Sequence, residues 1–317
     1  MTAHADGEQP RTDCRFVRTD RSQIEVTGDD AVAFLQGFCT NDVVKLAVGD
    51  GCEVFFCDAQ GKTIGFAEVY RSDSGLEVVT APGAATELIS HLEHFVVSED
   101  VEFTDRSGVW ATIDVVGPGA SSVCANVGRV TLDATPLTAA VVSAAATLRL
   151  NRNHGEYSWQ FRCPAESCSQ WLEKLATAGA REGDAQTLTG MRIVAGYPEF
   201  GAEVTSSRLP QELARDATAI SFNKGCYLGQ ETVARLDAMG RVNWLLARVT
   251  RKGDEPTSDA VEFTVEDKPA GHLTSAAVLD GNIVGLAILR REAVRVDGIV
   301  SSNGCEWRVD PIADLDD

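Results

Sequence analysis

Apolar and polar residues alternate along several short stretches in the first half of the chain, which is the pattern of half-buried β-strands. Strands are expected over Glu53–Cys57, Thr63–Tyr70 and Leu76–Thr80. After Pro82 the apolar positions change to helical spacing, with Leu88, Ile89, Leu92 and Phe95 on one face. The pattern over residues 53–103 therefore predicts three strands, then a helix, then a fourth strand.

A similar order recurs between residues 109 and 194. Strands are expected over Val109–Val116, Thr147–Asn151 and Tyr157–Cys163, and helices after Pro118, after Pro164 and over Asp184–Val194. An earlier helix is expected from Asp29 or Asp30 to Gln36, where Gly37 ends it. Antiparallel strands with helices on one face indicate an α+β core.

The pattern changes after Arg241, where helical spacing disappears. Strand-like stretches cover Val242–Thr250, Ala260–Val265, His272–Leu279, Ile283–Arg290 and Glu306–Val309, and Asp280-Gly281 is typical of a tight hairpin turn. The sequence therefore predicts two domains, an α+β core over residues 14–240 and a small antiparallel β-barrel over residues 241–317.

The chain has 317 residues, of which 44% are hydrophobic, and a formal net charge of -19. A surface this acidic repels nucleic acid phosphates and anionic lipids, which disfavours a nucleic-acid or membrane-surface role. It still permits a small anionic ligand in a local basic pocket. The polar N-terminus shows no secretory signal, and no stretch is long and apolar enough to span a bilayer. We therefore expect a cytoplasmic protein.

The nine cysteines are odd in number and include no Cys-x-x-Cys pair. In a protein of this size, that usage is typical of reduced thiols and not of a disulfide framework. Cys163 ends an expected strand and Cys168 lies on the following helix, which makes them a poor pair of zinc ligands. His91 and His94 share a helix face but lack a third ligand. We expect no metal site.

One cysteine differs from the others in its neighbours. Cys226 lies in the stretch Lys224–Glu231, after a stretch typical of a short strand, Ala219–Phe222, and at the start of an expected helix. A helix N-terminus and a nearby ammonium both favour the thiolate, the form that attacks electrophiles and binds metals. Gly225 and Gly229 permit close backbone approach. The alternative is a small buried side chain without chemistry, the commoner role of cysteine.

The octapeptide Lys224–Glu231 resembles the signature of the YgfZ family, folate-binding-type proteins related to the glycine-cleavage T-protein, an aminomethyltransferase. Other blocks resemble that family in the same order: Asp30–Gly37, Thr40–Val43, Gly61-Lys62, Arg192–Glu203, Gly271–Ser275 and Gly285–Ala287. The resemblance covers nearly the whole chain. It implies a T-protein-like folate-binding fold, with two interleaved ferredoxin-like lobes around a central ligand cavity and a C-terminal antiparallel β-barrel.

The resemblance also implies a function. The protein would bind tetrahydrofolate, or a one-carbon derivative, and support iron–sulfur cluster assembly or repair, with indirect effects on tRNA modification. Its partners would be reduced folate and iron–sulfur assembly proteins or client enzymes. Cys226 would be the reactive thiol, and Lys224 would lower its pKa or hold an anionic group. The other motif residues would shape the loop and fix the helix start: Gly225, Tyr227, Gly229, Gln230 and Glu231.

A reduced folate needs polar groups for its pterin, apolar or aromatic walls for its flat rings, and a cation for its glutamate tail. Asn41 and Asp42 follow a helix end, where they either face a pocket or fold a turn. Trp159 and Gln160 are neighbours on a strand and therefore point to opposite faces. Gln160 is a candidate pterin ligand. Trp159 either stacks on a ring or, as is commoner, belongs to the core.

Two further candidates for folate binding come from the central block of the chain. Arg192, near the end of an expected helix, either clamps a carboxylate or favours the helix C-terminus. Glu203 either orients Arg192 or is solvated.

The chain departs from the T-protein at two positions. Matched on Gly61, the catalytic aspartate of the T-protein falls at Gly65 or Phe66, and the nearest carboxylate is Glu68. The pterin-binding glutamate falls near Gln160, whose amide cannot form a charge-assisted pair. These departures disfavour glycine cleavage. A folate-dependent aminomethyltransferase or methyltransferase that uses Glu68 is the alternative, and an interaction scaffold is the third possibility.

Overall fold

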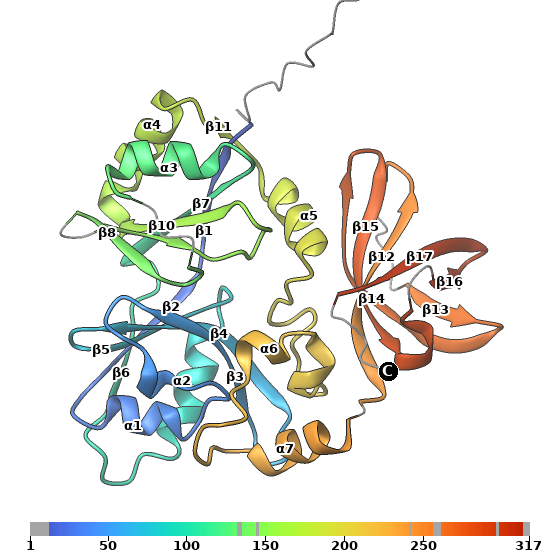
Figure 1. Ribbon diagram of the computed structural model, residues 1–317, viewed down its shortest axis with the longest axis horizontal. Coiled ribbons are helices and arrows are strands. Elements are labelled where there is room, and N and C mark those ends of the chain that lie inside the picture. Colours follow the sequence, from blue (N-terminus) through green and yellow to red (C-terminus); the bar gives the residue numbers. More distant parts are fainter. Residues whose placement is uncertain are drawn as a thin grey trace, which may run out of the picture.

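The computed structural model describes residues 13–131, 135–143, 146–240, 242–255, 261–295 and 298–312. Figure 1 shows two α/β lobes, one above the other, and a β-barrel beside them. In each lobe the helices lie on the outer side of the sheet, so the two sheets face each other across the middle of the molecule. This arrangement confirms the expected fold class.

Lobe A, the upper lobe in Figure 1, is built on a six-stranded sheet. In sheet order the strands are β11 (Arg181–Glu182), β1 (Arg15–Thr19), β7 (Trp110–Val116), β10 (Ser158–Pro164), β9 (Ala146–Leu150) and β8 (Ala139–Ser143). Neighbouring strands are antiparallel except β1 and β11. Its helices are α3 (Ala120–Gly128), the short η2 (Ala165–Ser167) and α4 (Cys168–Thr177).

Lobe B is a five-stranded antiparallel sheet. Its strands, in sheet order, are β3 (Gly51–Cys57), β4 (Thr63–Ser72), β5 (Gly75–Thr80), β2 (Ser22–Thr27) and β6 (Glu102–Asp105). Its helices are α1 (Ala31–Gln36), η1 (Val43–Lys45) and α2 (Ala85–Glu93). The hairpin of β3 and β4 and the helix after Pro82 form where the apolar spacing predicts them.

The two lobes are interleaved along the chain. Strand β1 belongs to lobe A, and the chain then crosses at Asp20-Arg21 into β2 of lobe B. It completes lobe B through β6 before it returns to lobe A with β7. Because of this crossing, residues near position 20 lie between the two sheets.

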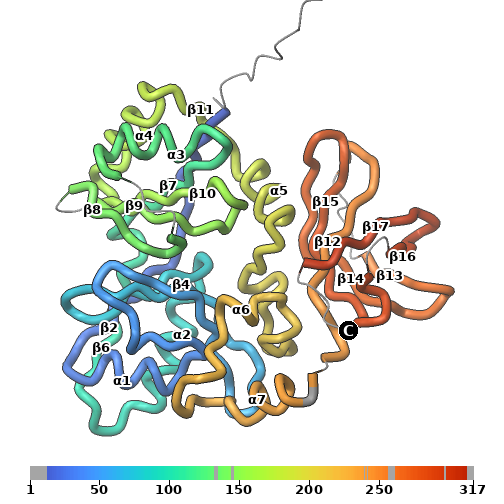
Figure 2. The backbone as a smooth tube through the Cα atoms, in the orientation of Figure 1, coloured from blue at the N-terminus to red at the C-terminus, as the bar shows by residue number. Residues whose placement is uncertain are grey.

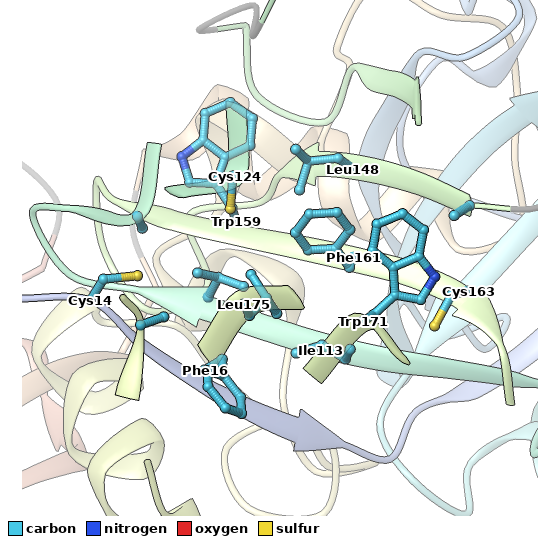
Figure 3. Packing of buried hydrophobic residues seen from close by; sticks show 14 of the residues in the cluster. Cys14, Phe16, Ile113, Cys124, Leu148, Trp159, Phe161, Cys163, Trp171 and Leu175 are labelled. Atoms are coloured by element: carbon cyan, nitrogen blue, oxygen red, sulfur yellow. The ribbon is translucent and has the colours of Figure 1, made fainter. Parts of the chain in front are cut away.

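Alternation along the strands gives each sheet one apolar and one mixed face. In β10, Trp159 and Phe161 join the hydrophobic cluster under α3 and α4, with Trp171 and Leu175 of α4 (Figure 3). The residue between them, Gln160, points the other way, toward lobe B. The outer faces therefore form two hydrophobic cores, and the inner faces meet with polar side chains.

The rest of the chain connects the lobes to the barrel. Helix α5 (Ala185–Ala195) begins at Asp184, whose carboxylate accepts the N–H of Thr187 at 2.7 Å, and packs against barrel strands β14 and β15. Three short helices follow: η3 (Pro210–Leu213), α6 (Asp216–Ala219) and α7 (Gln230–Met239). Figure 2 shows α5, in yellow, between lobe A and the barrel, and α7, in orange, at the lower edge of lobe B.

The closed barrel has six antiparallel strands. In order around the barrel they are β12 (Trp244–Lys252), β15 (Asn282–Arg290), β14 (Lys268–Leu279), β13 (Glu262–Val265), β16 (Gly298–Ser302) and β17 (Cys305–Pro311), with η4 (Arg291–Ala293) after β15. The apolar pattern does not predict β16, which is short and half polar. The division into domains at residues 240 and 241 stays a prediction, and Ala260, Arg241 and residues 313–317 lie outside the described residues.

Candidate functional site

The cysteine singled out by the sequence, Cys226, is exposed. It lies on the loop between α6 and α7, which we call the thiol loop (residues 220–229). The structure has no strand over the described stretch Ala219–Phe222, so the prediction of a strand there is wrong. Ala219 is the last residue of α6. The N–H of Ser221 donates one backbone hydrogen bond, of 3.0 Å, to the carbonyl of Thr40. Helix α7 begins at Gln230, as predicted.

Lys224 is buried, and its ammonium group points at the segment that follows α1. Its Nζ donates to the carbonyl oxygens of Gln36, Cys39 and Asn41, each at 2.7 Å. Sγ of Cys39 lies 3.9 Å from the same nitrogen, and burial raises the pKa of that thiol. Because the three carbonyls use all three N–H groups, the lysine fixes the thiol loop to lobe B and has no N–H left for an anionic group. The expectation that Lys224 could hold an anionic group is therefore wrong.

The two glycines of the motif have different surroundings. Gly229 has a φ of +82°, which glycine adopts without strain, and a Cβ there would lie 2.6 Å from the carbonyl oxygen of Asp58 and 3.0 Å from Cα of Gly61. The turn between β3 and β4 therefore packs directly on the start of α7. A Cβ on Gly225 would meet no atom within 4 Å, so the space around this backbone beside Cys226 is open.

The remaining motif residues hold the loop in the fold. Tyr227 is buried in a hydrophobic cluster that also contains Phe66 and Tyr197. The N–H of Gln230 donates to the carbonyl of Tyr227 at 3.1 Å. Glu231 is exposed in the first turn of α7, where its negative charge is favourable at the helix N-terminus.

A cavity lies between the two lobes, at the inner faces of the sheets. Its wall residues come from both lobes, from α5 and from the segment after α5: Arg21, Phe66, Ala67, Glu68, Val79, Thr80, Ala81, Asn153, Gln160, Arg192, Tyr197, Pro198, Glu199 and Phe200. Its free volume is about 20 Å³, which is room for one or two water molecules. Side chains therefore have to move before a larger ligand enters.

Glu68 is a buried carboxyl group in this wall. It accepts hydrogen bonds from the hydroxyl of Tyr70 and from Nδ2 of Asn153, both at 2.7 Å, and the hydroxyl of Tyr197 is 3.5 Å away. Burial raises the pKa of Glu68, while these two hydrogen bonds and the charge of Arg21 act in the opposite direction. The carboxyl group is thus less readily ionised than an ordinary glutamate.

Strand β10 places two predicted folate residues on opposite faces of its sheet. Gln160 lines the cavity, and its Nε2 donates to Asp114 at 3.2 Å. Asp114 also accepts the hydroxyl of Thr19 at 2.6 Å. Trp159 packs in the core of lobe A, and its Nε1 donates to the hydroxyl of Ser121 in α3 at 2.9 Å (Figure 3). Trp159 is therefore a core residue, and the alternative that it stacks on a ligand ring is wrong.

Arg192 lines the cavity and is held from several sides. Its guanidinium donates to Glu203 at 3.0 Å, to the carbonyl of Tyr197 at 2.7 Å and to the hydroxyl of Ser275 at 2.8 Å. Glu203 is buried and also accepts the hydroxyl of Ser275 at 2.6 Å. Glu203 thus orients Arg192 and is not solvated.

The structure places Asn41 and Asp42 outside the cavity wall. Nδ2 of Asn41 donates to the carbonyls of Glu53, at 3.0 Å, and Thr218, at 2.8 Å. Asp42 pairs with Lys45 at 2.7 Å, and the hydrogen bond from this lysine holds the pKa of Asp42 below its ordinary value. Both side chains therefore stabilise the loop after α1. The alternative, that they face a ligand pocket, is wrong.

Sequence reasoning missed several polar residues at the inner faces of the sheets. Asp114 carried a signal, since it is a charged residue inside an otherwise apolar stretch and is fully buried. Arg21 and Asn153 lie in connections with no distinguishing pattern. His154, also in such a connection, is buried, and burial lowers its pKa to about 4, so its imidazole is neutral at neutral pH.

The thiol loop and the cavity are separate features that share a hydrophobic cluster. No residue of Lys224–Glu231 lines the cavity. Tyr227 of the loop packs in one cluster with the cavity residues Phe66 and Tyr197. Among the described residues, no group of three or more His, Cys, Asp and Glu side chains could hold a metal ion. No helix of the described part is long and apolar enough to cross a membrane.

Comparison with known proteins accounts for this architecture. Residues 18–224 match the family model of the GCVT N-terminal domain. A tRNA-modifying protein YgfZ from Cronobacter sakazakii is 27% identical over 90% of this chain and 88% of its own length, and one from Klebsiella pneumoniae is 26% identical over 96% and 95%.

A solved structure shows the same fold. The glycine cleavage system aminomethyltransferase T from Bartonella henselae superposes with a TM-score of 0.83 and 17% identity, over 96% of this chain and 86% of that chain. This likeness agrees with the interleaved lobes and the C-terminal barrel. The chain belongs to the family of the GCVT N-terminal domain, in its YgfZ branch.

Proposed function

We propose that this protein binds tetrahydrofolate, or a one-carbon derivative of it, in the cavity between the lobes. The wall offers what a pteridine ring requires. Gln160, Asn153 and Glu68 supply hydrogen-bonding groups, and Phe66 and Tyr197 supply flat apolar surface. Oδ1 of Asn153 is buried without a hydrogen-bond partner among the described residues, which favours a site that a polar ligand completes. Bound folate would supply or accept a one-carbon unit.

We further propose that the protein acts in the cytoplasm in the assembly or repair of iron–sulfur clusters, with Cys226 as the reactive thiol. Its partners would be assembly proteins or client enzymes, and effects on tRNA modification would follow from clients that modify tRNA. The YgfZ relatives are named tRNA-modifying proteins, which supports the link to tRNA modification. The observation that carries it is an exposed cysteine on a loop that is fixed on both sides of the cysteine, by Lys224 and by Gly229. A fixed loop holds the sulfur ready for a partner at little entropic cost.

Two cysteine variants test the thiol role. Of the cysteines in the described residues, Cys226 and Cys305 are the exposed ones, so Cys305→Ser is a matched control for Cys226→Ser. Each variant is returned to a strain that lacks the protein, and the activity of an iron–sulfur enzyme is measured. We expect Cys305→Ser to restore activity and Cys226→Ser to fail. Equal restoration by both variants would rule out the thiol role.

The alternative is a folate-dependent aminomethyltransferase or methyltransferase, and one observation favours it: Glu68 places a carboxyl group in the cavity wall beside Phe66. Its raised pKa weakens the alternative, because stabilisation of a developing positive charge needs the ionised form. A coupled assay for methylene-tetrahydrofolate separates the two functions. Turnover that is lost in Glu68→Gln would favour the enzyme, and the absence of turnover with wild type would exclude it.

A further inference from the structure

The cavity wall contains an arginine whose side chain has no hydrogen-bond or ion-pair partner in the described part of the chain. Arg21 lies at the crossing from lobe A to lobe B and lines the cavity. Other arginines of the region are engaged, since Arg192 pairs with Glu203 and Arg215 with Glu53. A guanidinium carries five N–H donors in a planar fork, so Arg21 presents unused donors at the cavity.

An unused acceptor belongs to the same wall. Asn153 is 2% exposed, and its Nδ2 is fixed by the hydrogen bond to Glu68. Its Oδ1 is buried and has no partner among the described residues. A buried polar atom without a partner is costly, and a ligand that supplies the missing partner recovers that free energy. The cavity thus offers a free donor on one side chain and a free acceptor on another.

We propose that Arg21 and Asn153 recognise the lactam edge of the ligand ring, where a carbonyl stands next to an N–H. The ring carbonyl accepts from the guanidinium of Arg21, and the ring N–H donates to Oδ1 of Asn153. This inference rests on the proposed folate function and deepens it, because it assigns the edge of the pteridine that enters the cavity. It makes both residues determinants of specificity for a 4-oxo ring over a 4-amino ring.

The charge around Arg21 disfavours the other anionic part of a folate, its glutamate tail. Burial lowers the pKa of Arg21, but the charges of Asp114, Glu68 and Glu199, with Tyr197, raise it above its ordinary value. These acids surround the arginine without contacting it, so a further carboxylate would meet repulsion from them. A neutral carbonyl supplies an acceptor without adding charge.

The small free volume of the cavity fits the same assignment. A ring enters only if a wall side chain moves, and Arg21 moves without breaking a hydrogen bond or an ion pair. Arg192, by comparison, would have to leave Glu203 and Ser275. Of the two arginines in the wall, Arg21 is therefore the one that moves without losing a hydrogen bond, and it gains partners when the ring carbonyl reaches it.

Calorimetric titration with two ligands tests the inference. Tetrahydrofolate carries the oxo group at C4, and tetrahydroaminopterin carries an amino group there, which reverses the donor and acceptor of that edge. Wild type should prefer tetrahydrofolate at least tenfold. Arg21→Gln should weaken tetrahydrofolate binding roughly 10- to 100-fold, the range for a charge-assisted hydrogen bond, and remove most of the preference. Arg21→Lys keeps the charge but loses the fork and should fall between.

Two further variants complete the experiment. Asn153→Ser should also reduce the preference, and Arg106→Gln, which alters an exposed arginine paired with Glu25 outside the cavity wall, should leave it unchanged. Urea unfolding confirms that each variant is folded. If Arg21→Gln keeps the wild-type preference, the inference is wrong while the folate function stands. If wild type binds neither ligand, the proposed folate function fails and the inference fails with it.

Discussion

The substitution Gly229→Ala tests whether the thiol loop depends on its contact with the turn of lobe B. Alanine at a φ of +82° costs about 1–2 kcal/mol. Its Cβ would lie 2.6 Å from the carbonyl oxygen of Asp58 and 3.0 Å from Cα of Gly61, both backbone atoms, so the turn has to shift. Overpacking of this kind costs about 1–3 kcal/mol. Alanine also lowers the conformational entropy of the unfolded chain, which stabilises the fold by about 0.4–1 kcal/mol. We expect the free energy of unfolding to fall by about 2–4 kcal/mol.

Gly225→Ala is the matched control within the same loop. A Cβ there meets nothing within 4 Å, so we expect a change of at most about 1 kcal/mol, in the stabilising direction. Urea unfolding measures both variants, and the midpoint should move while the slope stays constant. The reasoning is refuted if Gly229→Ala is as stable as wild type, or if both glycine variants lose the same stability.

Three further predictions follow from individual side chains. Lys224→Met should lower the free energy of unfolding by about 3 kcal/mol in urea, because one buried and two half-buried carbonyls lose their donor. An unchanged midpoint would contradict the anchoring role. Burial raises the pKa of Asp216 from 3.8 to about 6, so its ionisation destabilises the fold as pH rises through this range. Asp216→Asn should gain at most about 3 kcal/mol at pH 8 and nothing near pH 3, measured by thermal unfolding. Asp184→Asn is its opposite control. Hydrogen bonds from Thr187 lower the pKa of Asp184, so the variant should lose stability at neutral pH and lose less as pH falls below 3.8. Maleimide should label native protein fastest at Cys226 and Cys305, and mass spectrometry that finds another described cysteine equally fast would contradict the burial pattern.

Local pattern was sufficient for the elements that form around their own sequence signals. The hairpin of β3 and β4 and helix α5 form where periodicity predicts them, and the structure adds that Asp184 is the N-cap of α5. The interleaving of the lobes came from family resemblance, because no local signal shows that β1 and β2 belong to different sheets. The lysine and the two glycines around Cys226 singled out this cysteine in the sequence, and the structure shows that Cys226 is exposed.

The directions of individual side chains could not be predicted, since partners distant in sequence set them. Lys224 is two positions from Cys226, yet its ammonium is directed by carbonyls near residue 39. Ala219–Phe222 has strand-like composition but finds only one backbone partner, Thr40, and forms no strand. Asn41 and Trp159 could each serve a pocket or the fold, and only tertiary contacts decided for the fold.

A crystal structure of the protein grown with a reduced folate tests the central claim most directly. We predict density for the pteridine ring between the two sheets, in contact with Glu68 and Asn153, with the guanidinium of Arg21 displaced from its present position toward the ring carbonyl. An empty cavity at saturating ligand, or a ring bound elsewhere on the molecule, would contradict the account.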